Sequence, residues 1–177
     1  SGFVHIGHAK AALINRMLAD KYDGKMIFRF DDTNPAKEKE HFEDAIIEDM
    51  GKLGVAWDIG VTYSSDYFKE MMEFAEGMLK AGTAYCDDTD REVMKQCRWD
   101  GKATNCRENS IETNMAMWQE MKAGSAKGIT TCLRAKMSID DPNKCLRDPV
   151  MYRCNIEVPH TRTGDAWKVY PTYDFCC

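Results

Sequence analysis

Residues 25–35 read KMIFRFDDTNP, a short segment in which apolar residues alternate and then give way to polar ones. The alternation around Phe28 and Phe30 predicts a β-strand over residues 25–31. The residues from Asp31 to Pro35 are of types that hydrogen-bond their own backbone, so they predict a loop directly after the strand. The segment therefore predicts a strand that delivers polar side chains to its carboxyl end.

Helical patterns flank this strand on both sides. Apolar residues at helical spacing predict a helix over residues 7–22, which Gly24 ends, and another over residues 42–53, which Gly54 ends. This order favours an α/β fold whose parallel strands are joined by crossover helices. The later residues predict a helix from residues 64–66 to the residue before Gly82, a loop-rich stretch over 97–109, a helix over 111–121, a strand over 130–137, a turn over 140–143 and a last strand over 167–170.

The composition is that of an ordinary folded protein. Of the 177 residues, 44% are hydrophobic and 30% are charged, and the formal net charge is −5. These values exclude a disordered chain and a uniformly basic nucleic-acid binder. Apolar runs fall short of the roughly 18–20 residues that a membrane span needs, so we expect no membrane association. The first residues lack a secretion signal, and Gly2 and Gly7 read as the middle of a motif, so we expect a cytoplasmic protein that naturally starts before Ser1.

The eight cysteines raise the question of disulfides or zinc. They lie at positions 86, 97, 106, 132, 145, 154, 176 and 177, and no pair has the two-residue gap of a zinc knuckle or redox motif. Twelve methionines and no secretion signal favour a reducing compartment. We therefore expect free thiols, several of them in the core, and no structural zinc.

The segment His5-Ile6-Gly7-His8 lies at the start of the first expected helix. Two imidazoles three residues apart share one helical face, next to unpaired N–H groups and the positive end of the helix dipole. Such a site suits a polyphosphate, and Lys10 adds a cation one turn along. Gly7 would let a flat ring such as adenine lie against the backbone. Two histidines could also bind a metal, but the sequence places no third ligand.

Six segments in order carry a resemblance to one family. They are residues 1–10 (SGFVHIGHAK), 28–35 (FRFDDTNP), 63–67 (YSSDY), 133–136 (LRAK), 147–153 (RDPVMYR) and 170–175 (YPTYDF). Together they closely resemble the signature segments of the class I glutamyl- and glutaminyl-tRNA synthetases, in register over the whole chain. Within that pair, residues 109–121 and 159–164 look more like the eukaryotic cytosolic glutamyl enzymes.

This resemblance implies a ligase that adenylates glutamate with ATP and then transfers it to the terminal ribose of tRNA(Glu). It implies a Rossmann-like parallel sheet whose first half is residues 1–65. Residues 66–172 would be an inserted mixed α+β domain that binds the tRNA acceptor stem, and residues 173–177 would begin the second half of the sheet. The family's remaining half-sheet, phosphate-clamping loop and anticodon-binding domain lie outside these residues. We therefore expect a catalytic-domain fragment with little or no charging activity, and possible partners in a multi-synthetase complex.

The resemblance also assigns roles to single residues. ATP, with Mg²⁺, would bind His5, Ile6, Gly7, His8, Ala9, Lys10 and Ala11. His5 and His8 would be catalytic, because imidazole N–H groups can stabilise charge that develops on the phosphoryl oxygens. Asp31, at the strand end, would hold the α-ammonium group of the amino acid together with Tyr173. Without the resemblance, Asp31 reads as a loop cap and Tyr173 as a core residue.

Basic residues of the expected insertion suit contacts with RNA phosphates. They are Arg98, Lys102, Arg107, Arg134 and Lys136, with Lys122 and Lys127 as further candidates. Lys136-Met137-Ser138 also resembles the start of the family's mobile Lys-Met-Ser-Lys-Ser loop. Ile139 and Asp140 follow it instead of Lys-Ser, so we interpret this match as chance and the preceding residues 133–135 as a strand.

Three alternative functions remain open from the sequence. A glutaminyl-tRNA synthetase shares the same segments. A non-catalytic scaffold protein would have no need of both histidines and Asp31. An enzyme that glutamylates a modified tRNA base would resemble compact relatives that bind zinc through clustered cysteines, which this chain lacks.

Overall fold

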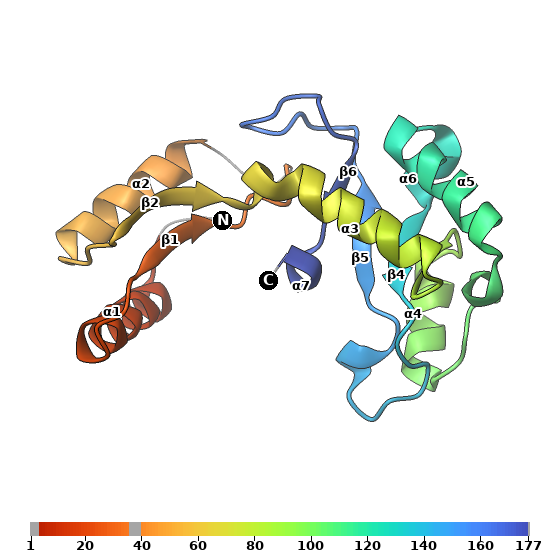
Figure 1. The fold of residues 1–177 in the computed structure, drawn as a ribbon, viewed down its shortest axis with the longest axis horizontal. Coiled ribbons are helices and arrows are strands. Elements are labelled where there is room, and N and C mark those ends of the chain that lie inside the picture. The colour runs from red at the N-terminus through yellow and green to blue at the C-terminus, as the bar shows by residue number, and fades with distance from the viewer. Residues whose placement is uncertain (1–3, 36–39, 177) are drawn as a thin grey trace.

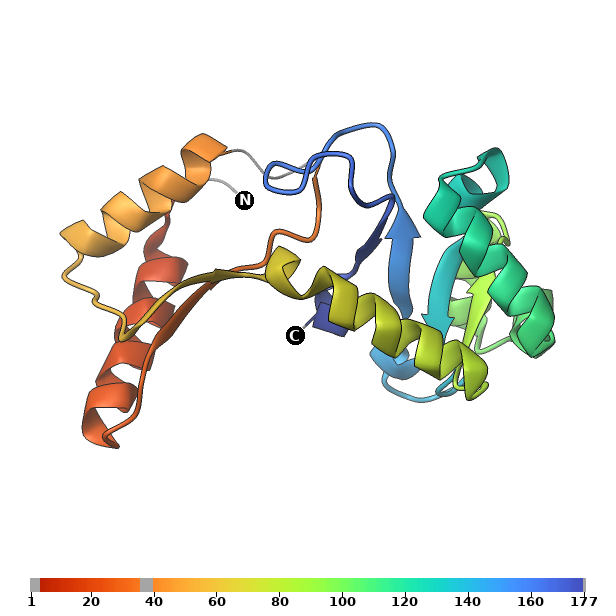
Figure 2. The same ribbon diagram turned by 45° about the horizontal axis from the view of Figure 1, so that its top comes forward.

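The computed structural model describes residues 4–35 and 40–176. These residues form two parts, each built around its own β-sheet (Figure 1). A two-stranded sheet lies at one end of the molecule and a four-stranded sheet at the other, and one long helix runs from the first part into the second (Figure 2).

The first part is a β–α–β unit preceded by a helix. Its elements are α1 (Ile6–Lys21), β1 (Ile27–Phe30), α2 (Glu40–Lys52) and β2 (Ile59–Tyr63). The two strands are parallel, with Phe30 opposite Tyr63, and α2 supplies the crossover. The parallel pair confirms the α/β expectation for this part of the chain.

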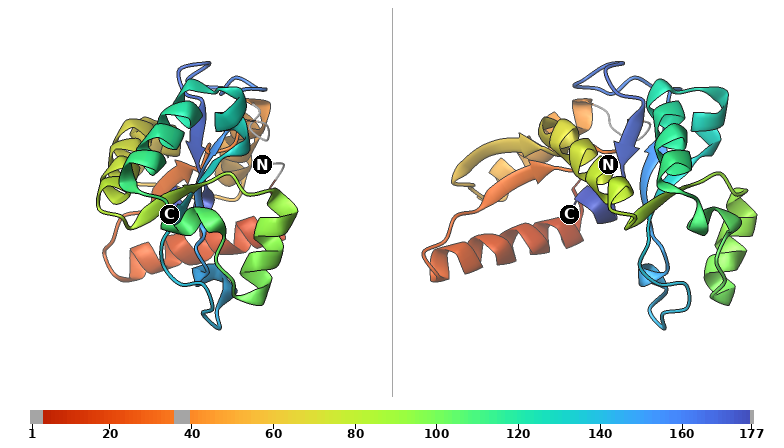
Figure 3. Two further views of the ribbon diagram at one scale, coloured as in Figure 1. Left: turned by 90° about the vertical axis from the view of Figure 1, so that its right-hand side faces the viewer. Right: turned by 45° about the vertical axis from the view of Figure 1, so that its right-hand side comes forward.

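Helix α1 runs back roughly antiparallel to β1 (Figures 2 and 3). Its first turn therefore lies toward the edge of the sheet where β1 ends. Arg16 ties the helix to the segment before β2, because its Nη1 lies 2.7 Å from Asp58 Oδ2. The apolar side chains of α1 remain open in the described structure, with Leu13 48% and Met17 57% exposed. This helix is thus held by a polar contact and not by a closed core.

The second part combines an antiparallel sheet with helices. Its strands are β3 (Ala84–Asp87), β4 (Cys132–Ala135), β5 (Val150–Cys154) and β6 (Val169–Pro171), in the spatial order β3-β4-β5-β6. Its helices are η1 (Ser64–Tyr67), α3 (Phe68–Lys80), α4 (Arg91–Asp100), η2 (Asn105–Glu108), α5 (Ile111–Ala123), α6 (Ala126–Thr130), η3 (Lys144–Leu146) and α7 (Tyr173–Cys176). This mixed α+β architecture agrees with the character expected after residue 65.

Aromatic and sulfur-containing side chains fill the core between this sheet and helices α3 and α5. Trp118 and Tyr152 are 0% and 1% exposed, and their rings meet edge to face at 5.4 Å. Leu79 and Met121 complete the contact and are fully buried. Burial of such side chains is worth about 1.5–3 kcal/mol each, so this part of the chain has the stronger core.

Some local expectations were wrong at their boundaries. Residues 97–100 are not loop but the last turn of α4, which Asp90 caps through its bond to Glu92 N at 2.9 Å. The helix has few apolar residues, so hydrophobic periodicity alone did not reveal it. The expected strand over 130–137 shortens to β4, because Thr130 still belongs to α6.

In the part of the chain that the structure describes, no helix is both long and apolar enough to cross a membrane.

Candidate active site

The first turn of α1 is organised by two histidines. His5 is the N-cap, and its Nδ1 accepts the N–H of Gly7 at 3.1 Å. His8 Nδ1 accepts the N–H of His5 at 3.3 Å, so each imidazole satisfies a backbone group at the open end of the helix. The two rings stack with their centroids 3.8 Å apart. The histidines expected to share a helical face do so.

These bonds decide which nitrogen of each ring can act on a ligand. Because Nδ1 accepts a hydrogen bond in both His5 and His8, a neutral ring carries its hydrogen on Nε2. Both side chains are exposed. The helix entrance therefore offers two stacked, exposed rings whose Nε2–H groups can donate to an anion.

The lack of a side chain at Gly7 leaves room for the His5 ring as well as for a ligand. A Cβ at this position would lie 2.9 Å from His5 Cε1 and 3.1 Å from His5 Nδ1. A side chain there would push the His5 ring out of its capping position. Around it, Ile6 is 89% exposed, Lys10 and Ala11 are exposed and Ala9 is half-buried, so the expected ATP segment is accessible.

Asp31 follows β1 directly, at the carboxyl end of the strand. Its Oδ1 accepts from Arg29 Nε at 2.9 Å and from Ser64 Oγ at 3.0 Å. Ser64 begins η1, just after β2, so the two parallel strands bring this pair together. The carboxylate is oriented from both sides and remains 29% exposed.

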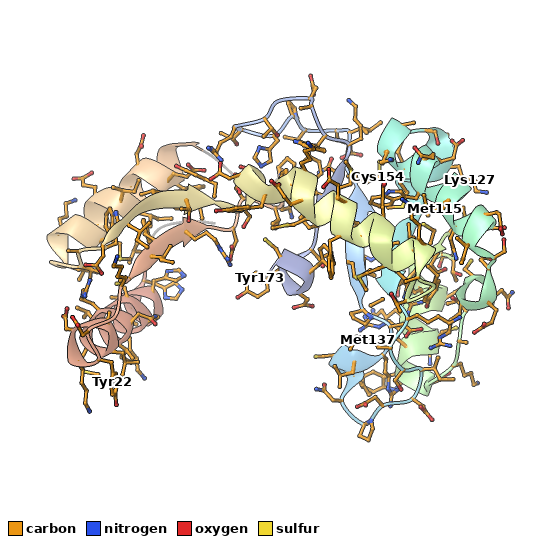
Figure 4. All side chains as sticks on the ribbon, in the orientation of Figure 1. Tyr22, Met115, Lys127, Met137, Cys154 and Tyr173 are labelled. Carbon is orange, nitrogen blue, oxygen red and sulfur yellow. The ribbon has the colours of Figure 1, made fainter. Side chains whose placement is uncertain are left out.

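A cleft of about 980 Å³ lies between the loop after β1 and the face of β5 and β6. Asp31 lines it from the first part of the chain, and Tyr173 lines it from α7. Tyr173 is 63% exposed, which is not the position of a core residue, and its ring projects from α7 toward the side of β1 (Figure 4). The two residues expected to bind the amino acid thus share one cavity. His5 and His8 do not line it; they lie at the first turn of α1, toward the same edge of the parallel sheet.

A buried polar cluster joins the two parts beside this cleft, and the sequence assigned no role to its members. Asp32 is 1% exposed and accepts from Ser65 N at 2.9 Å and from Ser65 Oγ at 2.6 Å. His160 Nε2 lies 2.7 Å from the carbonyl oxygen of Asp32, and Arg162 Nη1 donates to Ser65 Oγ at 2.6 Å. The signal for them was that residues 28–35, 63–67 and 159–164 belong to the segments that resemble the family.

Burial and neighbouring charges shift the pKa values of three residues beside the cluster: Asp66, Glu43 and Tyr63. Burial opposes ionisation of Asp66, but hydrogen bonds from Arg162 and from Tyr63 N lower its pKa below the ordinary value. Burial raises the pKa of Glu43, and its Oε1 is a buried oxygen that no partner in the described residues satisfies. Burial and the neighbouring Glu43 raise the pKa of Tyr63. The cluster is therefore densely charged at the junction of the two parts.

The structure corrects part of the expected RNA contact. Arg134 is 3% exposed, and its Nη1 lies 2.7 Å from Asp87, so it is buried under the sheet and does not face a nucleic acid. Arg107 Nε is bound to Asp148 Oδ2 at 2.7 Å. Arg98 donates to the carbonyl oxygen of Arg147 at 2.9 Å. These guanidiniums hold strands and turns together, and that long-range partnership is invisible in the sequence.

The lysines are more open. Lys102 is 73% exposed and lies 3.8 Å from Asp100, whereas Lys136 is 27% exposed and pairs with Glu108 at 3.0 Å. Lys127 is exposed on α6 (Figure 4), and Lys122 is bound to Glu76 at 2.6 Å. Lys136 directly follows β4, which contains the strand residues expected over 133–135.

The seven cysteines among the described residues are free thiols. Within residues 4–35 and 40–176 no three or more His, Cys, Asp or Glu side chains are arranged to hold a metal ion.

The class of protein follows from comparison with known families. The chain matches the family described as "tRNA synthetases class I (E and Q), catalytic domain" over residues 1–177, and it belongs to that family. It is 53% identical over 177 residues to "Glutamate--tRNA ligase, cytoplasmic" of Arabidopsis thaliana, covering 100% of this chain and 24% of that protein.

Two further relatives give the same picture. Identity is 55% to "Glutamate--tRNA ligase, cytoplasmic" of Saccharomyces cerevisiae, over 99% of this chain and 25% of that protein. It is 51% to "Bifunctional glutamate/proline--tRNA ligase" of Cricetulus griseus, over 100% of this chain and 12% of that protein. The chain therefore spans about a quarter of the length of the first two relatives.

Proposed function

We propose that the protein is a cytoplasmic glutamate–tRNA ligase that activates glutamate with ATP and transfers it to tRNA(Glu). The observation that carries this proposal is the shared cleft, which Asp31 and Tyr173 both line from segments 142 residues apart in a chain of the glutamyl/glutaminyl family. A carboxylate and a phenol hydroxyl are suitable acceptors for an ammonium group. The names of the similar proteins favour glutamate over glutamine.

In this proposal the chain positions two reactants. Asp31, held by Arg29 and Ser64, accepts the α-ammonium group of glutamate, and Tyr173 closes the same side of the cleft. The Nε2–H groups of His5 and His8 donate to phosphate oxygens of ATP, which enters with Mg²⁺. Charge that builds up on the α-phosphate during attack is then stabilised by donors already in place, which lowers the barrier without a covalent step.

The two parts of the chain have separate roles in the proposal. Residues 1–65 belong to the nucleotide-binding sheet, residues 66–172 to the insertion that binds the acceptor stem, and residues 173–177 return to the sheet. Because Arg134 and Arg107 are engaged internally, we assign RNA phosphates to the exposed lysines, Lys102 and Lys127.

Pyrophosphate exchange tests the proposal in the natural full-length protein. We expect exchange that depends on glutamate and is much weaker with glutamine. Asp31→Asn should raise the KM for glutamate by at least about tenfold, because it removes the charge opposite the ammonium group. Asp44→Asn, an exposed change on α2, is the control and should leave KM unchanged.

Two results would contradict the proposal. Preference for glutamine would indicate the glutaminyl enzyme. Absence of exchange with either amino acid in a folded protein would favour a non-catalytic scaffold.

A further inference from the structure

Two consecutive serines hold two consecutive aspartates at the end of β1. Ser64 Oγ donates to Asp31 Oδ1 at 3.0 Å, and Ser65 donates both its N–H and its Oγ–H to the Asp32 carboxylate. Because consecutive residues of η1 hold both carboxylates, the loop after β1 is tied to η1 at two adjacent points. Asp32 is 1% exposed, so its bonds cannot be exchanged for water.

The turn over residues 160–164 closes on this pair from the far end of the insertion. His160 Nδ1 accepts the N–H groups of Arg162 and Thr163, each at 3.2 Å. Its Nε2 must then carry the hydrogen and donate to the carbonyl oxygen of Asp32 at 2.7 Å. His160 therefore fixes the backbone of the residue that follows Asp31.

Arg162 decides the direction of the serine hydroxyl. Its Nη1 lies 2.6 Å from Ser65 Oγ and 2.8 Å from Asp66 Oδ1, and its guanidinium lies 3.7 Å over the ring of Tyr63. Arginine can only donate, so Ser65 Oγ accepts from Arg162. The hydroxyl hydrogen is then left for Asp32, and the chain of donors runs in one direction from Arg162 to Asp32.

We propose that Arg162 is a positioning residue for the amino-acid-binding carboxylate. It orients Ser65, which holds Asp32 and thereby keeps Asp31 facing the cleft. Arg162 does not line the cleft; it acts through Ser65 and through a longer ion pair with Asp32 Oδ2 at 4.0 Å. The inference rests on the proposed function, which gives Asp31 the ammonium group of the substrate.

The test uses Arg162→Gln in the natural full-length protein, measured by pyrophosphate exchange. We expect the KM for glutamate to rise about tenfold, while kcat and the KM for ATP change less than about twofold, because only the ammonium site loses its support. Arg162→Lys should restore most of the affinity, since an ammonium group can still donate to Ser65 Oγ and Asp66. Arg91→Gln, an exposed arginine in the first turn of α4, is the matched control and should behave as the wild type.

A KM for glutamate that stays within about twofold in folded Arg162→Gln would overturn the inference. So would equal losses in both KM values and kcat, which would indicate a general structural role. Should Arg162→Gln not fold, Ser65→Ala removes the hydroxyl through which Arg162 reaches Asp32 and must raise the same KM; an unchanged KM there overturns the inference too. Absence of glutamate-dependent exchange in the wild type would instead refute the proposed function itself.

Discussion

Arg134 and Asp87 form an ion pair at 2.7 Å in which the side chains are 4% and 0% exposed. They lie on neighbouring strands, β4 and β3, and Thr104 Oγ1 adds a bond to the same carboxylate at 2.8 Å. A buried pair of this kind is costly to break, because removal of one partner leaves the other charge buried and uncompensated. The pair thus holds β3 and β4 together in the sheet of the second part of the chain.

Asp87→Asn should destabilise the protein by about 3–5 kcal/mol at pH 7, since Arg134 would remain buried without its counter-charge. Burial raises the pKa of Asp87, but hydrogen bonds from Thr89 and Arg134 lower it by more, so it lies below the ordinary value. The stability from this carboxylate is then present above the unfolded-state pKa of about 3.9 and is lost as the pH falls further. Urea unfolding between pH 7 and pH 2.5 measures both effects.

In that experiment the wild type should lose stability below about pH 4, and Asp87→Asn should lose less over the same range. Asp165→Asn, at an exposed position, should follow the wild type. If Asp87→Asn loses as much stability as the wild type between pH 4 and pH 2.5, another carboxylate is responsible for the loss of stability at low pH.

Gly7→Ala tests the helix entrance. The new methyl group would meet the His5 ring at 2.9 Å, so the ring must move and its bond to the Gly7 N–H is disturbed. We expect the KM for ATP to rise by at least about tenfold in pyrophosphate exchange, because small displacements of donors are costly. Gly51→Ala on α2, where nothing lies within 4 Å, should change nothing. If the KM for ATP is the same in both variants, the position of the His5 ring does not matter for ATP binding.

The thiols should differ widely in reactivity. Burial raises the pKa of Cys86 and of Cys132 to about 12, whereas Cys145 is exposed. At pH 8 these two thiols, of which Cys86 is buried and Cys132 is half-buried, hold a thiolate fraction on the order of a thousandfold below that of an ordinary cysteine. Iodoacetamide should therefore label Cys145 first, as mass spectrometry of the native protein can follow. Denatured protein, in which all sites react, is the control, and early labelling of Cys86 would contradict the buried position.

The assignment of RNA phosphates to the exposed lysines can be tested through the salt dependence of tRNA binding. Lys102→Ala should weaken tRNA binding and lower the slope of log affinity against log salt by about one, because one phosphate contact is lost. Lys80→Ala, an exposed lysine at the end of α3, should leave the slope unchanged. Filter binding at several salt concentrations measures both. If the slope for Lys102→Ala equals that of the wild type, Lys102 makes no contact with an RNA phosphate.

The sequence determined several of the local elements and their order, although α4, β2, β3 and β5 were not predicted. The alternation around Phe28 and Phe30 predicted β1, the spacing after it predicted α2, and the strand–helix order predicted a parallel sheet, but β2 itself was not predicted. These patterns succeed because strand and helix periods are set by neighbours within a few residues. The histidine pair was predictable for the same reason, since residues three apart in a helix must meet.

Only the tertiary structure decided what the polar side chains do. Arg134 reads as an RNA contact until β3 brings Asp87 beside it, 47 residues away in the chain. His160 and Asp32 are 128 residues apart and meet because the end of the second part folds back over the first. A charged side chain can pair with an oppositely charged group of the protein or with a ligand. Which of the two it does depends on which groups the fold buries beside it, away from water. That exclusion is a property of the whole packed chain, so no local pattern can contain it.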